Sequence, residues 1–128
     1  MSFKAKFKAG NIEQNVLDCS YKLHQEVDKT GRPSSITRGG IIDLVVESNE
    51  KTDLFEWMCN NFERKDGSVV FLKRDSDATM KELKFKEGYL IGYSEEFTAS
   101  TDSPMNIGIR ISAKEITVGN GTHKNEWV

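Results

Sequence analysis

The chain has 128 residues, of which 37% are hydrophobic and 30% are charged, and its formal net charge at pH 7 is -2. This length predicts one domain that spans residues 1–128. The composition is too apolar for a disordered chain and too polar for direct membrane insertion, and the near-neutral charge gives no reason to expect a nucleic-acid partner. The N-terminus has no apolar stretch typical of secretory signals, so we expect a chain that folds in the cytoplasm.

Strand-like alternation of apolar and polar residues begins at the N-terminus. Apolar side chains at every second position of Phe3–Phe7 predict a half-buried strand, and Gly10-Asn11 predicts a turn after it. A second strand is expected from Ile12 to about Val27. Its apolar positions change parity midway, which requires a bulge or bend near Val16–Asp18. Kinks of this kind suit a sheet that curves into a barrel.

The segment Asp28–Gly40 interrupts the strands with glycines, hydroxyl residues and a proline. It is longer than the usual hairpin loop of about 2–5 residues, and loops of this size in compact domains are often functional. Arg32 and Arg38 give it two multi-donor side chains suited to carboxylates or carbonyls of a partner. The segment is therefore the first candidate for a functional surface.

One helix is expected after the next strand, Ile41–Val46. Apolar residues at helical spacing predict a helix of about 12 residues that starts at Asp53 and ends before Gly67. The expected buried stripe consists of Leu54, Phe55, Met58, Cys59 and Phe62. If Phe62 is buried, its truncation to alanine should cost roughly 3–5 kcal/mol.

The remaining alternating runs predict further strands at Val69–Leu72, Leu83–Tyr93 and Met105–Ala113. The parity of the last run slips before Ile116, which predicts a second bulge near Lys114-Glu115. Together these runs indicate a small, curved, mainly β protein with one packed helix.

Residues for catalysis or metal binding are scarce. His24 is expected to point away from the apolar face, His123 is expected in a polar tail, and Cys19 and Cys59 are expected as buried free thiols. No Cys-x-x-Cys or paired histidines suggest zinc. The sequence therefore predicts no enzyme activity, no metal and no cofactor, and favours a binding or assembly module. A small-ligand-binding barrel remains open at this point.

Several stretches, taken in order, resemble the Hcp (TssD) family of type VI secretion tube proteins in its short form. They are MSFKAKFKAGN at the start, TGRPSSITRGG (Thr30–Gly40), DLFEWMCNNFERKDG (Asp53–Gly67), FLKRDSDA (Phe71–Ala78), LKFKEGYLIGY (Leu83–Tyr93), and ISAKEITVGNG followed by NEWV. The resemblance implies a small β-barrel of two antiparallel sheets flanked by one α-helix, with a long extended loop. It also implies hexameric rings that stack into a hollow tube, which sheath contraction ejects together with effectors.

In such a tube the long loop would contact neighbouring subunits and adjoining rings. The residues to which the resemblance gives this role are Asp28, Thr30, Gly31, Arg32, Pro33, Ser34, Ser35, Arg38, Gly39 and Gly40. The implied partners are further copies of the chain, the sheath, spike and baseplate proteins, and effectors in the lumen. The protein would be cytoplasmic when assembled and secreted on firing without a Sec signal. Two alternatives stay open: a tube protein of a phage-tail-like injection system, and an accessory Hcp paralogue that carries effectors.

Overall fold

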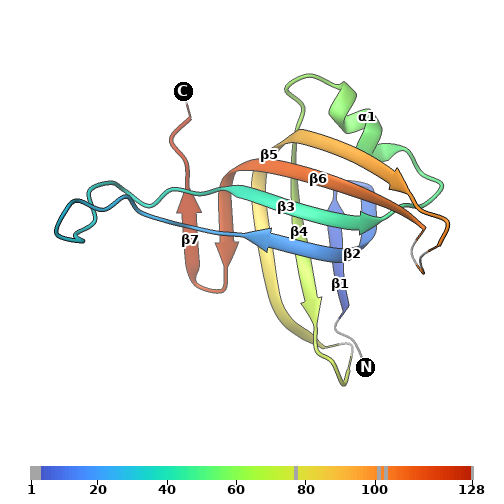
Figure 1. The fold of residues 1–128 in the computed structure, drawn as a ribbon, viewed down its shortest axis with the longest axis horizontal. Helices are drawn as coiled ribbons and strands as arrows, with labels where there is room; N and C mark the ends of the chain where they lie inside the picture. The colour runs from blue at the N-terminus through green and yellow to red at the C-terminus, as the bar shows by residue number, and fades with distance from the viewer. Residues whose placement is uncertain (1–3, 77, 101, 103, 128) are drawn as a thin grey trace.

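The computed structural model describes residues 4–76, 78–100, 102 and 104–127. Its strands are all paired antiparallel, in the order β3-β2-β1-β4-β5-β6-β7, and a further pairing of β3 with β6 closes the sheet on itself. Six strands thus form a closed barrel, and β7 extends the sheet from β6 outside that ring (Figure 1). The elements are β1 (Lys4–Ala9), β2 (Ile12–Tyr21), β3 (Ile41–Glu47), α1 (Asp53–Cys59), β4 (Arg64–Leu72), β5 (Thr79–Phe97), β6 (Met105–Val118) and β7 (Gly121–Lys124).

This architecture confirms the predicted fold class: a mainly β protein with a small antiparallel barrel, one helix and a long extended loop. The barrel strands belong to one continuous hydrogen-bonded ring, whereas two antiparallel sheets were expected. Residues 22–40 join β2 to β3 and project from one end of the barrel (Figure 1). We call this segment the arm.

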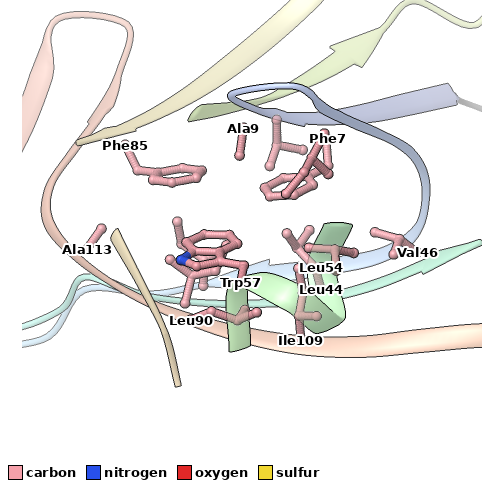
Figure 2. Close-up of a cluster of buried hydrophobic side chains, with 14 of the residues drawn as sticks. Phe7, Ala9, Leu44, Val46, Leu54, Trp57, Phe85, Leu90, Ile109 and Ala113 are labelled. Carbon is pink, nitrogen blue, oxygen red and sulfur yellow. The ribbon is translucent and has the colours of Figure 1, made fainter. Parts of the chain in front are cut away.

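The core fills the interior of the barrel with side chains from every barrel strand and from α1. Phe7 of β1 and Phe85 of β5 lie with nearly parallel rings, whose centroids are 6.1 Å apart. Trp57 and Leu54 enter this cluster from the helix, and Leu44 enters it from β3 (Figure 2). Each fully buried large apolar side chain stabilises the fold by about 1.5–3 kcal/mol, so this cluster holds the ring together.

The helix is shorter than predicted and buries a different face. It spans Asp53–Cys59 and turns only Leu54 and Trp57 inward. Phe55 and Met58, which were expected in the buried stripe, are exposed. Trp57 is 2% exposed, and its indole Nε1 donates a hydrogen bond to the Glu63 carbonyl at 3.0 Å. The backbone becomes extended at Asn60, so the helical spacing that continued to Phe62 in the sequence does not continue in space.

Burial of Phe62 was therefore a wrong prediction. Its side chain is 86% exposed and its φ is 64°. Cys59 is also exposed, which corrects its expected burial, whereas Cys19 is half-buried. Gly67 does not end the helix but lies within β4, where a Cβ would come 2.3 Å from the Lys8 carbonyl.

The first of the two predicted bulges is present, whereas at the second predicted position β6 shows no shift of register against β5. The pairing of β2 with β3 shifts register between Val16 and Asp18, as the change of parity indicated. Near Lys114-Glu115 the pairing of β6 with β5 is regular. At this position the strand leaves β3 after Ser112 and pairs with β7 from Glu115 onward. The consecutive residues Ala113 and Lys114 both hydrogen-bond along that edge, which is where the inward parity of β6 changes. The second strand also ends at Tyr21, short of the expected Val27.

Candidate assembly surface

The arm is a two-stranded extension held by its own backbone. The amides and carbonyls of His24 and Arg38 exchange two hydrogen bonds, of 3.0 and 2.7 Å. Farther out, the Ser34 amide donates to the Glu26 carbonyl at 2.7 Å, and Pro33 lies opposite Val27 in an isolated bridge. These contacts hold the backbone of the arm in a defined shape.

The tip of the arm turns around a single carboxylate. Asp28 Oδ1 accepts hydrogen bonds from the Thr30 hydroxyl at 2.7 Å, the Thr30 amide at 2.9 Å and the Arg32 amide at 3.1 Å. These donors, the Thr30 hydroxyl first, hold the pKa of Asp28 below its usual value. Gly31 adopts a φ of 89°, which glycine reaches without the steric cost of a Cβ.

Hydroxyl groups fasten the returning side of the arm. Ser35 Oγ accepts from the Glu26 amide at 2.9 Å, and Gln25 Nε2 donates to the Ser35 carbonyl at 3.1 Å. The structure thus brings the ten predicted loop residues into one element. Asp28, Thr30, Gly31 and Arg32 form its tip, Pro33 to Arg38 form its return, and Gly39 and Gly40 form its root at the barrel.

Steric constraints favour glycine at both positions of the root. A Cβ on Gly39 would lie 2.3 Å from Leu23 Cδ2, and Gly40 has a φ of 98°. A Cβ on Gly40 would lie 2.5 Å from Nδ2 of Asn125, a residue near the C-terminus. No pattern in the sequence pointed to Asn125, because nothing in its local neighbourhood signals a contact with residue 40.

The arm exposes apolar and basic groups. Val27 is 61% exposed and Ile36 is 74% exposed, so neither is covered by its own chain. The arm has four basic residues, Lys22, Lys29, Arg32 and Arg38, and two acidic ones, Glu26 and Asp28.

The opposite end of the barrel has the reverse charge. There the end of β3 and the turn from β5 to β6 lie together, because Asn106 pairs with both Glu47 and Glu96 (Figure 1). We call residues 47–51 and 95–105 the acidic end, and within it nothing is described for 101 and 103. Its charged residues are Glu47, Glu50, Glu95, Glu96, Asp102 and Lys51. Phe97 is 68% exposed at this end, so apolar surface accompanies the acidic charge there as well.

Burial, followed by the nearby Asp18 and Asp43, raises the pKa of the Cys19 thiol to about 11, so it is protonated and a weak nucleophile at neutral pH. In the described ranges no group of three or more potential ligands could hold a metal ion. No helix there is long and apolar enough to cross a membrane.

One expected feature of the tail needs correction. His123 does not lie in a polar tail but in β7, where it is only 8% exposed. The main hollows of the described surface are open grooves, and the barrel interior itself is filled by side chains such as Phe7, Trp57 and Phe85. A ligand-binding barrel would need an internal cavity in that position.

This architecture is similar to that of known proteins. The family model "Hemolysin coregulated protein Hcp (TssD)" matches residues 1–128. Hcp1 from Flavobacterium johnsoniae is 50% identical, with a TM-score of 0.91 over 95% of this chain and 99% of that one. Hcp1 from Salmonella typhimurium is 13% identical, with a TM-score of 0.74 over 96% and 92% of the two chains. No curated protein sequence matches the chain.

A more distant likeness extends beyond these proteins. A chain of the PVC sheath–tube complex, from an extracellular contractile injection system, is 18% identical, with a TM-score of 0.57 over 91% of this chain and 88% of that one. At that identity the likeness concerns the fold alone.

A closed barrel with one helix and a projecting arm defines the class of ring-forming tube proteins of secretion machines. Within that class the match of the family model over the entire chain is decisive. The chain belongs to the Hcp (TssD) family, the tube proteins of type VI secretion.

Proposed function

We propose that the protein forms hexameric rings that stack into the hollow inner tube of a type VI secretion system, and that sheath contraction ejects this tube together with effectors. The observation that carries the proposal is the arm, an ordered extension that leaves Val27 and Ile36 exposed and carries more basic than acidic residues. In this role the 128 residues act as one structural unit and need no enzyme activity.

The two ends of the barrel support head-to-tail stacking. The arm carries an excess of basic residues and the acidic end an excess of acidic ones, and each end also exposes apolar side chains. Complementary charge aligns such surfaces, and burial of apolar area stabilises the contact. A contact between two different surfaces of identical subunits is heterologous, so it repeats along an axis and produces a tube.

The further partners of the proposal are those of a contractile machine. The tube is assembled in the cytoplasm inside a sheath, on a baseplate, with a spike at its end. Effectors occupy the lumen, and the tube leaves the cell without a Sec signal. The arm residues from Asp28 to Gly40 make the ring-to-ring contact.

Imaging and mass measurement test the proposal directly. Purified protein should give six-fold rings with a central hole in negative stain, a native mass of about six subunits, and end-to-end stacks at high concentration. A protein that stays monomeric at high concentration contradicts the proposal.

The tube of a phage-tail-like injection system is the weaker alternative. Its representative here is 18% identical against 50% for the Hcp1 protein, and it matches less well in structure. An accessory paralogue that carries effectors shares every feature of the fold. Mixed rings with a second Hcp protein from the same cells would identify that role.

A further inference from the structure

Strand β6 exchanges one partner for another beside the root of the arm. Its pairing with β3 ends at Ser112, and its pairing with β7 begins at Glu115. On the edge of β6 that faces β3 and β7, the backbone groups of Ala113 and Lys114 belong to neither of these two strand pairings. Buried backbone groups need hydrogen-bond partners, so this exchange point has to be completed by other parts of the chain.

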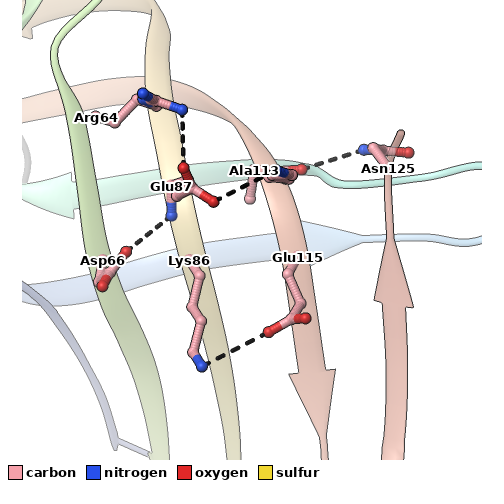
Figure 3. Close-up of polar contacts among 8 residues, drawn as sticks. Arg64, Asp66, Lys86, Glu87, Ala113, Glu115 and Asn125 are labelled. Atoms are coloured by element: carbon pink, nitrogen blue, oxygen red, sulfur yellow. Dashed lines mark hydrogen bonds and ion pairs between the residues drawn. The ribbon is translucent and has the colours of Figure 1, made fainter. Parts of the chain in front are cut away.

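A single residue, Asn125, supplies the missing donors. Its Nδ2 donates to the carbonyl of Gly39 at 3.0 Å and to the carbonyl of Ala113 at 3.1 Å (Figure 3 draws the second bond). Its backbone amide donates to the Lys114 carbonyl at 2.7 Å. The side chain therefore joins the arm, β6 and the C-terminal segment at one point.

The amide of Asn125 is itself held in orientation. With both hydrogens of Nδ2 in use, its Oδ1 is the acceptor for Nε2 of His123, 2.9 Å away. His123 is buried in β7, so this bond is shielded from water. On the other side, the Ala113 amide donates to the Gly40 carbonyl at 2.8 Å, which closes the network around the root.

Beyond the root, the hydrogen bonds of residues 22–38 in the described part of the chain are internal to the arm. The direction in which the arm leaves the barrel therefore depends on the root. A small rotation at the root moves the tip through a large distance, because the tip lies at the far end of a narrow extension (Figure 1).

We propose that Asn125 is a positioning residue that latches the root of the arm to β6 and so fixes the direction of the arm for assembly. The proposal rests on the proposed stacking function, because stacking requires each subunit of a ring to present its arm in the same direction. The C-terminal segment thereby takes part in assembly without touching the next ring.

The wild type and two variants form a series in the number of hydrogen bonds that the side chain of residue 125 can donate. Asparagine donates two, Asn125→Ser donates one at most, and Asn125→Asp donates none and places a carboxylate against two carbonyl oxygens. Asn11→Asp makes the same chemical change at an exposed turn and is the matched control.

Amide hydrogen exchange is the readout, at a protein concentration where light scattering detects no stacks. The informative amides are that of Arg38, which precedes the root and donates to His24, and that of Ala113, which donates to Gly40 of the root. We expect exchange at both to rise by roughly 10- to 100-fold in Asn125→Asp and by an intermediate factor in Asn125→Ser. In the variants at position 125, amides of the barrel core, such as that of Val69, should exchange as in the wild type. In the control Asn11→Asp, the amides of Arg38 and Ala113 should also exchange as in the wild type.

Tube formation completes the test. We expect Asn125→Asp to form rings of wild-type mass that stack far more weakly than wild-type rings. Exchange at Arg38 and Ala113 that matches the wild type in both variants at position 125 overturns the latch, whether or not tubes form. If the Asp variant fails to fold, the Ser variant alone decides. Wild-type protein that forms no rings overturns the proposed function, while the exchange result still decides the latch.

Discussion

The barrel and the arm are ordered by different interactions. The barrel strands close around a cluster of apolar side chains, and residues such as Phe7 and Ile42 are completely buried. The arm is held by backbone pairing and by hydrogen bonds to Asp28 and Ser35, while Val27 and Ile36 face outward. The fold of the barrel thus depends on buried apolar volume, whereas the shape of the arm depends on polar groups in fixed places. Substitutions should therefore affect either stability or assembly, according to the region.

The largest effect on stability is expected at the helix. Trp57→Ala removes the largest fully buried side chain and the bond of its indole to Glu63, and should destabilise the protein by about 3–5 kcal/mol. Phe62→Ala, five positions farther along the sequence and exposed, should stay within about 0.5 kcal/mol of the wild type. Thermal or denaturant unfolding measures both, and equal losses would contradict the division between buried and exposed faces.

Deletion of Thr30–Ser35 should separate assembly from stability most clearly. The tip contributes no side chain to the barrel core, so the melting temperature should change little while stacking of rings is lost. Electron microscopy of the purified variant checks this outcome. Tubes of normal length would show that the tip takes no part in stacking.

A pair of charge reversals should sharpen the contrast between the two ends. Arg32→Glu on the arm and Glu96→Arg at the acidic end should each weaken stacking, and the double variant should recover it. In a head-to-tail contact the double variant restores opposite charges at every junction. Sedimentation of tubes measures the effect, with Glu13→Arg on the exposed face of β2 as control. A double variant that stacks less than either single variant would argue against this pairing of ends.

The smallest effect is expected from protonation of the arm tip. The pKa of Asp28 is lowered in the folded protein, so its contribution to the tip is present above the pKa of a free aspartate, about 3.9. This contribution is lost as pH falls through the lower folded value. Exchange of the Thr30 and Arg32 amides should therefore rise at that pH, and Asp28→Asn should show faster exchange at neutral pH. A tip whose exchange is the same in both proteins would mean that Asp28 does not order it.

The sequence predicted best where a residue's role depends on near neighbours. Alternation located the barrel strands, and the change of parity in β2 located the bulge between Val16 and Asp18. The excess length and composition of Asp28–Gly40 marked the arm, although its paired backbone was not foreseen. Predictions failed where distant segments decide. Helical spacing continues from Leu54 to Phe62, but the extended backbone at Asn60 ends the helix and leaves Trp57 as the inward residue.

The other failures have the same origin. The slip in β6 was interpreted as a bulge alone, and the change of partner from β3 to β7 at the same place was not foreseen. Asn125 had no recognisable signal, because its two carbonyl partners lie 86 and 12 residues away in the sequence. A single chain without aligned relatives cannot reveal such pairs through spacing alone.

The closure of β3 on β6 also has a consequence for biosynthesis. The two strands pair from Ile41 with Ser112 to Glu47 with Asn106, so the ring is completed by β6, the sixth barrel strand in chain order. During translation the first five barrel strands emerge with two open edges, and their closing partner follows last. Long-range pairing of this kind folds slowly and leaves strand edges exposed in the meantime. Until β6 pairs, β3 and β5 are the open edges of the sheet, and unpaired strand edges of this kind are the sites where another chain can add by β pairing.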